Sequence, residues 1–145
     1  MNITDEDFTG KSVDGKREGR WTSYYDEAGR AADTDPNVYH YGLKKEAYYR
    51  NGLLHGLYAE YYKKGFKAYC HFKEGKLHGA AGWYYPGNNL KYKGQFENGH
   101  KSGAWEAYNR AGKLMFVDGY EAGKLVSNVT HEAFEKLKTP NFKLE

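Results

Sequence analysis

The stretch Tyr92-Lys-Gly-Gln-Phe-Glu-Asn-Gly-His-Lys-Ser-Gly-Ala-Trp-Glu-Ala-Tyr108 holds the pattern that decides the fold. Its first part alternates apolar or small residues with polar ones, as a half-buried β-strand does. Asn98-Gly99 is a strong hairpin signal, because a type I′ turn needs positive φ at both central residues. An aromatic segment with Trp105 follows the turn. The stretch therefore predicts one β-hairpin.

The same pattern, a turn dipeptide followed by Gly-x-x-x-Gly, occurs five times in the chain. The five turn dipeptides are Asp14-Gly15, Asn51-Gly52, Glu74-Gly75, Asn98-Gly99 and Asp118-Gly119, and the second glycines are Gly19, Gly56, Gly79, Gly103 and Gly123. The leading glycines lie 37, 23, 24 and 20 residues apart, and a period in this range is typical of stacked supersecondary units. The long first interval predicts an insertion near residues 31–38.

These observations predict an all-β fold, an elongated single-layer antiparallel sheet of tandem β-hairpins with a short C-terminal helix. We expect residues 15–126 to form the repeats and residues 1–14 to form an acidic lead, either a short strand or a loose tail. Residues 127–145 would form a cap, in which a helix from Thr130 to about Lys138 covers the last strand. With 39% apolar and 17% aromatic residues, burial must rely on amphipathic rings.

Aromatic residues recur at fixed positions after the second glycine of each repeat. Trp21, Tyr58 and Trp105 lie two positions after it, and Tyr24, Tyr61, Tyr84 and Tyr108 lie five positions after it. An interval of three reverses the face of a strand, so either the strand contains a bulge or both faces carry rings. We interpret these seven residues as a structural ladder of stacked side chains.

A second aromatic set is the candidate recognition surface. It comprises Tyr25, Tyr62 and Tyr85 at the sixth position, together with Trp83. Tyrosine and tryptophan are enriched in interface hot spots, and an array places them in a row. Stacking against the same residue of the neighbouring repeat is the competing structural interpretation. The hypothesis is that Tyr25, Tyr62, Tyr85 and Trp83 bind a partner.

Charge and composition give weaker information about location and partners. Residues 1–38 carry a net charge of −4 and residues 39–145 carry +7, a bias that attracts acidic protein surfaces, anionic lipid or nucleic acid without distinguishing them. We expect a protein partner, with anionic lipid as the alternative, and no nucleic acid. The acidic start, the lack of a long apolar stretch and the single cysteine, Cys70, favour a cytoplasmic protein.

No catalytic or metal-binding constellation is apparent in the sequence. His55 and His78 share a repeat position, but equivalent residues one hairpin apart lie about 10 Å from each other, whereas zinc-bound nitrogens lie about 2 Å from the ion. We expect these histidines to bond nearby backbone. Ser102 and His100 lie near Asp118 in the chain, but no nucleophile elbow accompanies them. We predict a protein without enzymatic activity, metal or cofactor.

The unit Tyr92 to Gly112 resembles a MORN repeat, and the chain resembles the bacterial MORN-variant family most. Asn51-Gly52-Leu-Leu-His-Gly-Leu-Tyr-Ala-Glu-Tyr-Tyr62 and Glu74-Gly75-Lys-Leu-His-Gly79 match its recurring string. The resemblance covers about residues 15–125. It implies a non-catalytic antitoxin or immunity protein that binds and neutralises a toxin, or, as in eukaryotic relatives, a scaffold on anionic lipid. A capped array would be a monomer or a weak homo-oligomer.

Overall fold

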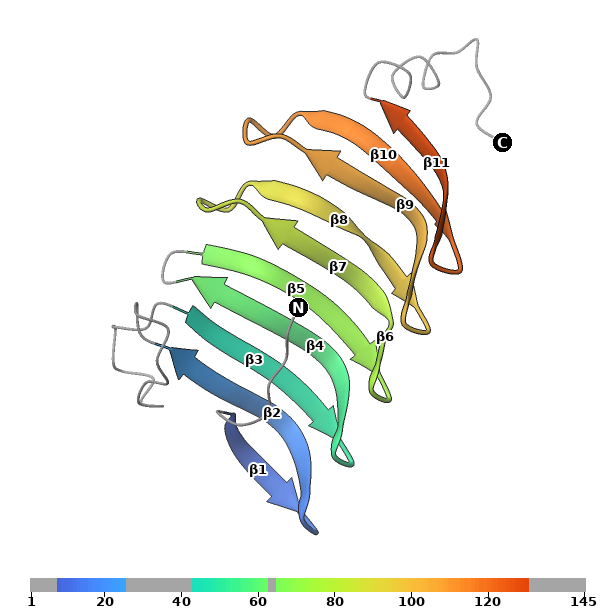
Figure 1. Cartoon of the computed structure of the whole chain (residues 1–145). Helices are drawn as coiled ribbons and strands as arrows, with labels where there is room; N and C mark the ends of the chain where they lie inside the picture. Colours follow the sequence, from blue (N-terminus) through green and yellow to red (C-terminus); the bar gives the residue numbers. More distant parts are fainter. Residues whose placement is uncertain (1–7, 26–42, 63–64, 131–145) are drawn as a thin grey trace.

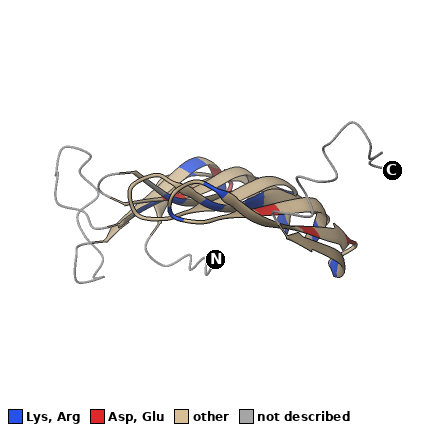
Figure 2. Cartoon of the chain, turned by 90° about the horizontal axis from the view of Figure 1, so that it is seen from above, with Lys and Arg blue, Asp and Glu red and all other residues tan. Residues whose placement is uncertain are grey.

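The computed structural model describes residues 8–25, 43–62 and 65–130 of the 145-residue chain. These residues form one antiparallel sheet of eleven strands in the order β1-β2-β3-β4-β5-β7-β8-β9-β10-β11, with β6 paired to β5 (Figure 1). Seen from above, the sheet is a single layer with charged residues along its length (Figure 2). The predicted all-β, single-layer hairpin architecture is confirmed. The strands are β1 (Thr9–Val13), β2 (Lys16–Tyr25), β3 (Leu43–Arg50), β4 (Leu53–Tyr62), β5 (Gly65–Lys73), β6 (Lys76–Leu77), β7 (Gly79–Tyr84), β8 (Leu90–Glu97), β9 (His100–Tyr108), β10 (Leu114–Glu121) and β11 (Lys124–Thr130).

Four of the five predicted turns are confirmed by their backbone angles. Asp14, Asn51, Glu74 and Asn98 have φ between 49° and 52°, and the glycines that follow them have φ between 77° and 87°. Two successive positive φ values are the signature of a type I′ turn, whose twist matches that of the flanking strands. The turns therefore fix the hairpins β1-β2, β3-β4, β5-β6 and β8-β9.

The fifth predicted turn, Asp118-Gly119, is wrong. Gly119 lies inside β10, where it pairs with Ala104 of β9 and Ser127 of β11. The turn is instead Ala122-Gly123, with φ of 49° and 85°. Measured to Gly123, the last interval is 24 residues, the same as from Gly75 to Gly99. The repeat period therefore continues unbroken, and the Gly-x-x-x-Gly from 119 to 123 is coincidental.

The structure describes a strand in each of the two expected end segments. Residues 9–13 form β1, the short strand that was one of the two alternatives for the lead, and it pairs with β2 in the first hairpin. At the other end, β11 extends through Thr130, past the expected array end at 126. The predicted helix beyond Thr130 and the predicted insertion at 31–38 lie outside the described residues.

Neighbouring hairpins are joined at their turns by a repeated hydrogen bond. The N–H of each turn glycine donates to a carbonyl of the preceding hairpin: Gly52 to Arg17 at 2.9 Å, Gly75 to Leu54 at 2.8 Å, Gly99 to Leu77 at 2.8 Å and Gly123 to Lys101 at 3.0 Å. In three hairpins the backbone N–H of the first turn residue also donates a hydrogen bond to a side chain of the preceding hairpin. Asn51 donates to Glu18, Glu74 to His55 and Asn98 to His78. The prediction that these histidines bond nearby backbone is thus confirmed.

Two tryptophans lie flat over glycines of the adjacent strand. A Cβ on Gly94 would come within 2.1 Å of the Trp105 ring, and one on Gly10 within 2.6 Å of the Trp21 ring. Each indole Nε1 donates to a carbonyl on that strand, Trp105 to Gln95 at 3.2 Å and Trp21 to Lys11 at 3.1 Å. Because glycine has no side chain, the indole ring can pack directly against the backbone of the adjacent strand. This occurs in both the first and the fourth hairpin.

We expect Gly94→Ala to lower the free energy of unfolding by about 2–4 kcal/mol, because the added methyl displaces the buried Trp105 ring and breaks its hydrogen bond. Urea denaturation followed by tryptophan fluorescence measures this. Gln95→Ala is the control, since the Gln95 side chain is exposed and only its backbone carbonyl is used. Equal stability of the two variants would contradict the close-packing argument.

Candidate functional site

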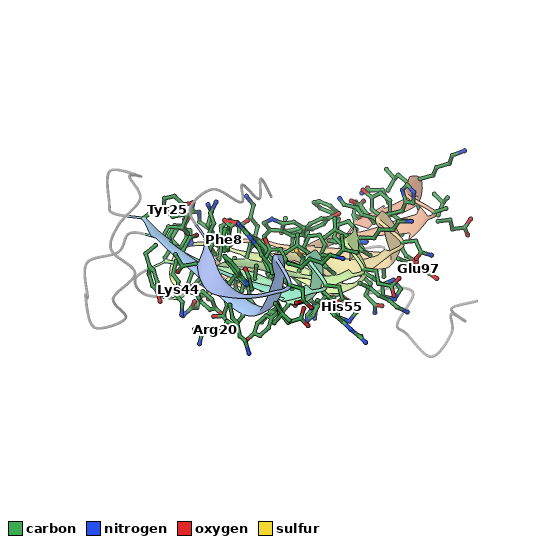
Figure 3. The ribbon with its side chains drawn as sticks, turned by 90° about the horizontal axis from the view of Figure 1, so that it is seen from below. Phe8, Arg20, Tyr25, Lys44, His55 and Glu97 are labelled. Atoms are coloured by element: carbon green, nitrogen blue, oxygen red, sulfur yellow. The ribbon has the colours of Figure 1, made fainter. Side chains whose placement is uncertain are left out.

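The two faces of the sheet carry different side chains. Residues paired directly across antiparallel strands share a face, and the pairs Trp21 with Ala47, Ala47 with Tyr58, and Tyr58 with Cys70 place a buried cluster on one of them. We call this side the aromatic face. Phe8 and Tyr25 lie on that side of the ribbon, and Arg20, Lys44 and His55 lie on the other side (Figure 3).

The predicted structural ladder is divided between these faces. Trp21, Tyr58 and Trp105 are buried in the cluster of the aromatic face. Tyr24 and Tyr61 lie on the opposite face, where both pair with Lys44 and the Lys44 ammonium lies 5.9 and 5.6 Å from their ring centroids. Tyr84 joins Tyr69 there at 6.2 Å, and Tyr108 donates to Glu106. Of the two alternatives left open by the sequence, rings on both faces is the one observed.

The aromatic face is hollowed into a groove of about 1110 Å³ that extends from the end of β4 to β11. Three of the four predicted partner-binding residues, Tyr62, Trp83 and Tyr85, line this groove. Tyr25 belongs to the same face but lies outside the groove. Trp83 also packs into the cluster, with its ring 5.9 Å from Trp105 and 6.1 Å from Tyr92. The tryptophan therefore serves as floor of the groove and as part of the core.

Each tyrosine of the predicted recognition set carries a lysine on its ring. The ammonium of Lys45 lies 5.1 Å from the Tyr25 centroid, that of Lys67 lies 5.8 Å from Tyr62, and that of Lys91 lies 5.5 Å from Tyr85. Arg110 adds a second cation to Tyr85 at 5.0 Å. We call these three pairs the lysine–tyrosine row. Such cation–π contacts hold the charge and the ring in one arrangement.

Two of the three lysines of the row, Lys67 and Lys91, lie at β-bulges that sequence reasoning missed. The register shifts where Lys67, Lys91 and Met115 each form an extra residue on the first strand of a hairpin. A bulge redirects a side chain, and here it brings Lys67 and Lys91 onto the aromatic face. The three residues lie 24 apart, so the repeat period was the signal that could have found them. Met115 replaces the lysine in the last hairpin.

The carboxylates on the aromatic face are engaged within the sheet. Glu60, 5% exposed, accepts from the Tyr58 hydroxyl at 3.2 Å and pairs with Lys67 at 3.4 Å. Asp118, 9% exposed, accepts from Asn128 and from Tyr92. Among the described residues, Lys45, Lys91 and Arg110 form no ion pair with a carboxylate. Of these three residues, Lys91 and Arg110 line the groove and give it positive charge.

Two phenols of the aromatic face, those of Tyr92 and Tyr58, have raised pKa values. Burial is the main cause that raises the pKa of Tyr92, and the hydrogen bond with Tyr120 adds to it. Burial likewise raises the pKa of Tyr58, with a contribution from the charge of Glu60. Within the described part of the chain, no three His, Cys, Asp or Glu side chains come close enough to hold a metal ion.

Comparison with protein-family models and with curated proteins finds no match for this chain. Nor is there, in the part of the chain that the structure describes, a helix of the length and hydrophobicity needed to cross a membrane. The MORN resemblance and the roles that it implies therefore stay predictions.

We expect Trp105→Ala to cost about 3–5 kcal/mol of folding free energy, because the ring is fully buried and its removal leaves a cavity. Tyr62→Ala, at a side chain that is 39% exposed, should change stability by no more than about 1 kcal/mol. Urea titrations of both variants measure the difference. The reverse order would mean that core and surface are wrongly assigned.

We expect Cys70 to resist Ellman's reagent until the protein unfolds. The side chain is 2% exposed, and burial raises the pKa of the thiol to about 12, so the reactive thiolate is scarce at pH 8. The labelling rate in the native state should fall well below the rate in 6 M guanidinium, by about a hundredfold or more. Labelling at the same rate in both conditions would contradict the buried position.

Proposed function

We propose that this protein is a non-catalytic binding module that holds another protein in the groove of its aromatic face. The observation that carries the proposal is the lysine–tyrosine row beside an open, aromatic-lined groove. Tyrosine and tryptophan contribute large contact areas at low entropic cost. Lysine and arginine beside them favour an acidic surface on the partner.

The groove is already ordered before a partner arrives. Tyr85 donates its hydroxyl hydrogen bond to the backbone carbonyl of Tyr108 at 3.0 Å, and Arg110 and Lys91 contact its ring. A ring fixed in this way loses little side-chain entropy on binding. A preorganised surface of this kind supports tight binding by a small sheet.

We propose further that the partner is a toxin and that binding neutralises it. Support for this role comes from the resemblance of the repeats to the bacterial MORN-variant family. Coexpression with the product of the neighbouring open reading frame tests the role directly. Growth should be arrested by that product alone and restored when this protein is present, and a harmless neighbour would count against the toxin role.

We expect Tyr62→Ala and Tyr85→Ala each to weaken partner binding by about 1–2 kcal/mol, because both remove a ring from the groove. The partner is first isolated from native lysate at low salt, and its affinity is then measured by calorimetry with each variant. Tyr48→Ala is the matched control, since Tyr48 lies on the opposite face, paired with Arg20.

The proposal fails if no stoichiometric protein is recovered. It also fails if Tyr48→Ala weakens binding as much as the groove variants do.

A further inference from the structure

We infer that the bound segment is an acidic α-helix that crosses the strands along the lysine–tyrosine row and continues into the groove. One carboxylate in each heptad of this helix would face one lysine of the row. This inference rests on the proposed protein-binding function and specifies the chemistry of the partner. It is carried by the spacing of the lysines, by the charges around them and by the apolar end of the row.

The lysines of the row recur at every second strand. Lys45 is on β3, Lys67 on β5 and Lys91 on β8, with β4 and β7 between them. Neighbouring strands lie about 4.8 Å apart, so one step of the row is about 10 Å. All three ammoniums are held on tyrosine rings of the same face. The sheet thus presents cations at a regular interval.

An α-helix matches this interval and an extended strand does not. Seven helical residues span about 10.5 Å and return to nearly the same face of the helix. In a strand, residues on one face recur at about 6.8 Å and 13.6 Å, neither of which fits a 10 Å step. Carboxylates at positions i, i+7 and i+14 of a helix would therefore face Lys45, Lys67 and Lys91.

The charges and the apolar surface favour the same occupant. Lys45 and Lys91 have no carboxylate partner among the described residues, whereas Lys67 forms an ion pair with Glu60 at 3.4 Å. At the far end of the row the bulge residue is Met115, 44% exposed, beside Phe116, 36% exposed. We therefore expect the fourth heptad position of the helix to be apolar, resting on β10.

A designed 25-residue peptide tests the inference by fluorescence anisotropy with the purified full chain. The probe carries Glu at positions 1, 8 and 15 and Leu at 22, and its control has the same composition and helicity with Glu at 1, 6 and 11. The heptad peptide should bind at least tenfold more tightly at 50 mM NaCl. Equal affinity of the two peptides would overturn the inference, because net charge alone would then explain binding.

Two lysine variants test the contact itself. Lys91→Gln should weaken binding of the heptad peptide about three- to tenfold. Lys93→Gln is the matched control, because Lys93 is on the same strand but lies on the opposite face, 3.7 Å from Glu106. Equal effects of the two changes would also overturn the inference.

Other ligands and the natural partner complete the experiment. Tighter binding to phosphatidylglycerol vesicles or to single-stranded RNA than to the heptad peptide would overturn the acidic helix. If Tyr85→Ala releases the natural partner but Lys91→Gln does not, the helix inference fails and the binding function stands. If neither change releases the partner, the proposed function itself fails.

Discussion

The hydrogen bond from each turn glycine to the preceding hairpin is the constraint on which the array depends. A single-layer sheet has no second layer to hold its strands in register, so neighbouring hairpins must be fixed by contacts along their shared edge. The bonds from Gly52, Gly75, Gly99 and Gly123 recur at 2.8–3.0 Å. Because a type I′ turn directs its glycine N–H outward, the same local conformation that closes one hairpin also attaches it to the previous one.

The aromatic residues add cohesion on both faces at once. Trp105 is fully buried although the sheet is one layer thick, because Trp83, Tyr92 and Phe96 pack around it. On the opposite face, tyrosines alternate with charged residues such as Lys44 and Glu46, and the phenols contact those charges. Amphipathic rings thus replace the aliphatic core that a protein of this composition lacks.

Local turn chemistry made most of the fold predictable from the sequence. Asn-Gly and Asp-Gly define their own conformation, so three turns followed directly, and Glu74-Gly75 followed from its place in the repeat. Ala122-Gly123 was missed because alanine carries no such signal and Gly119 offered a false alternative. The bulges at Lys67 and Lys91 were missed because a bulge is a property of two paired strands. The candidate recognition tyrosines Tyr25, Tyr62 and Tyr85 do lie on one face, but two of the lysines on their rings, Lys67 and Lys91, are brought there by those bulges.

The steady period of the bulges has a consequence for how such a protein can vary. Since each hairpin contacts only its neighbours, adding or deleting one 24-residue unit would lengthen or shorten the sheet without disturbing the remaining units. Each added unit would contribute one more cation at the same step, and the Met115 of the last hairpin would still mark the end. If the groove holds a helix as inferred above, the number of hairpins would set how many heptads of that helix the sheet can contact.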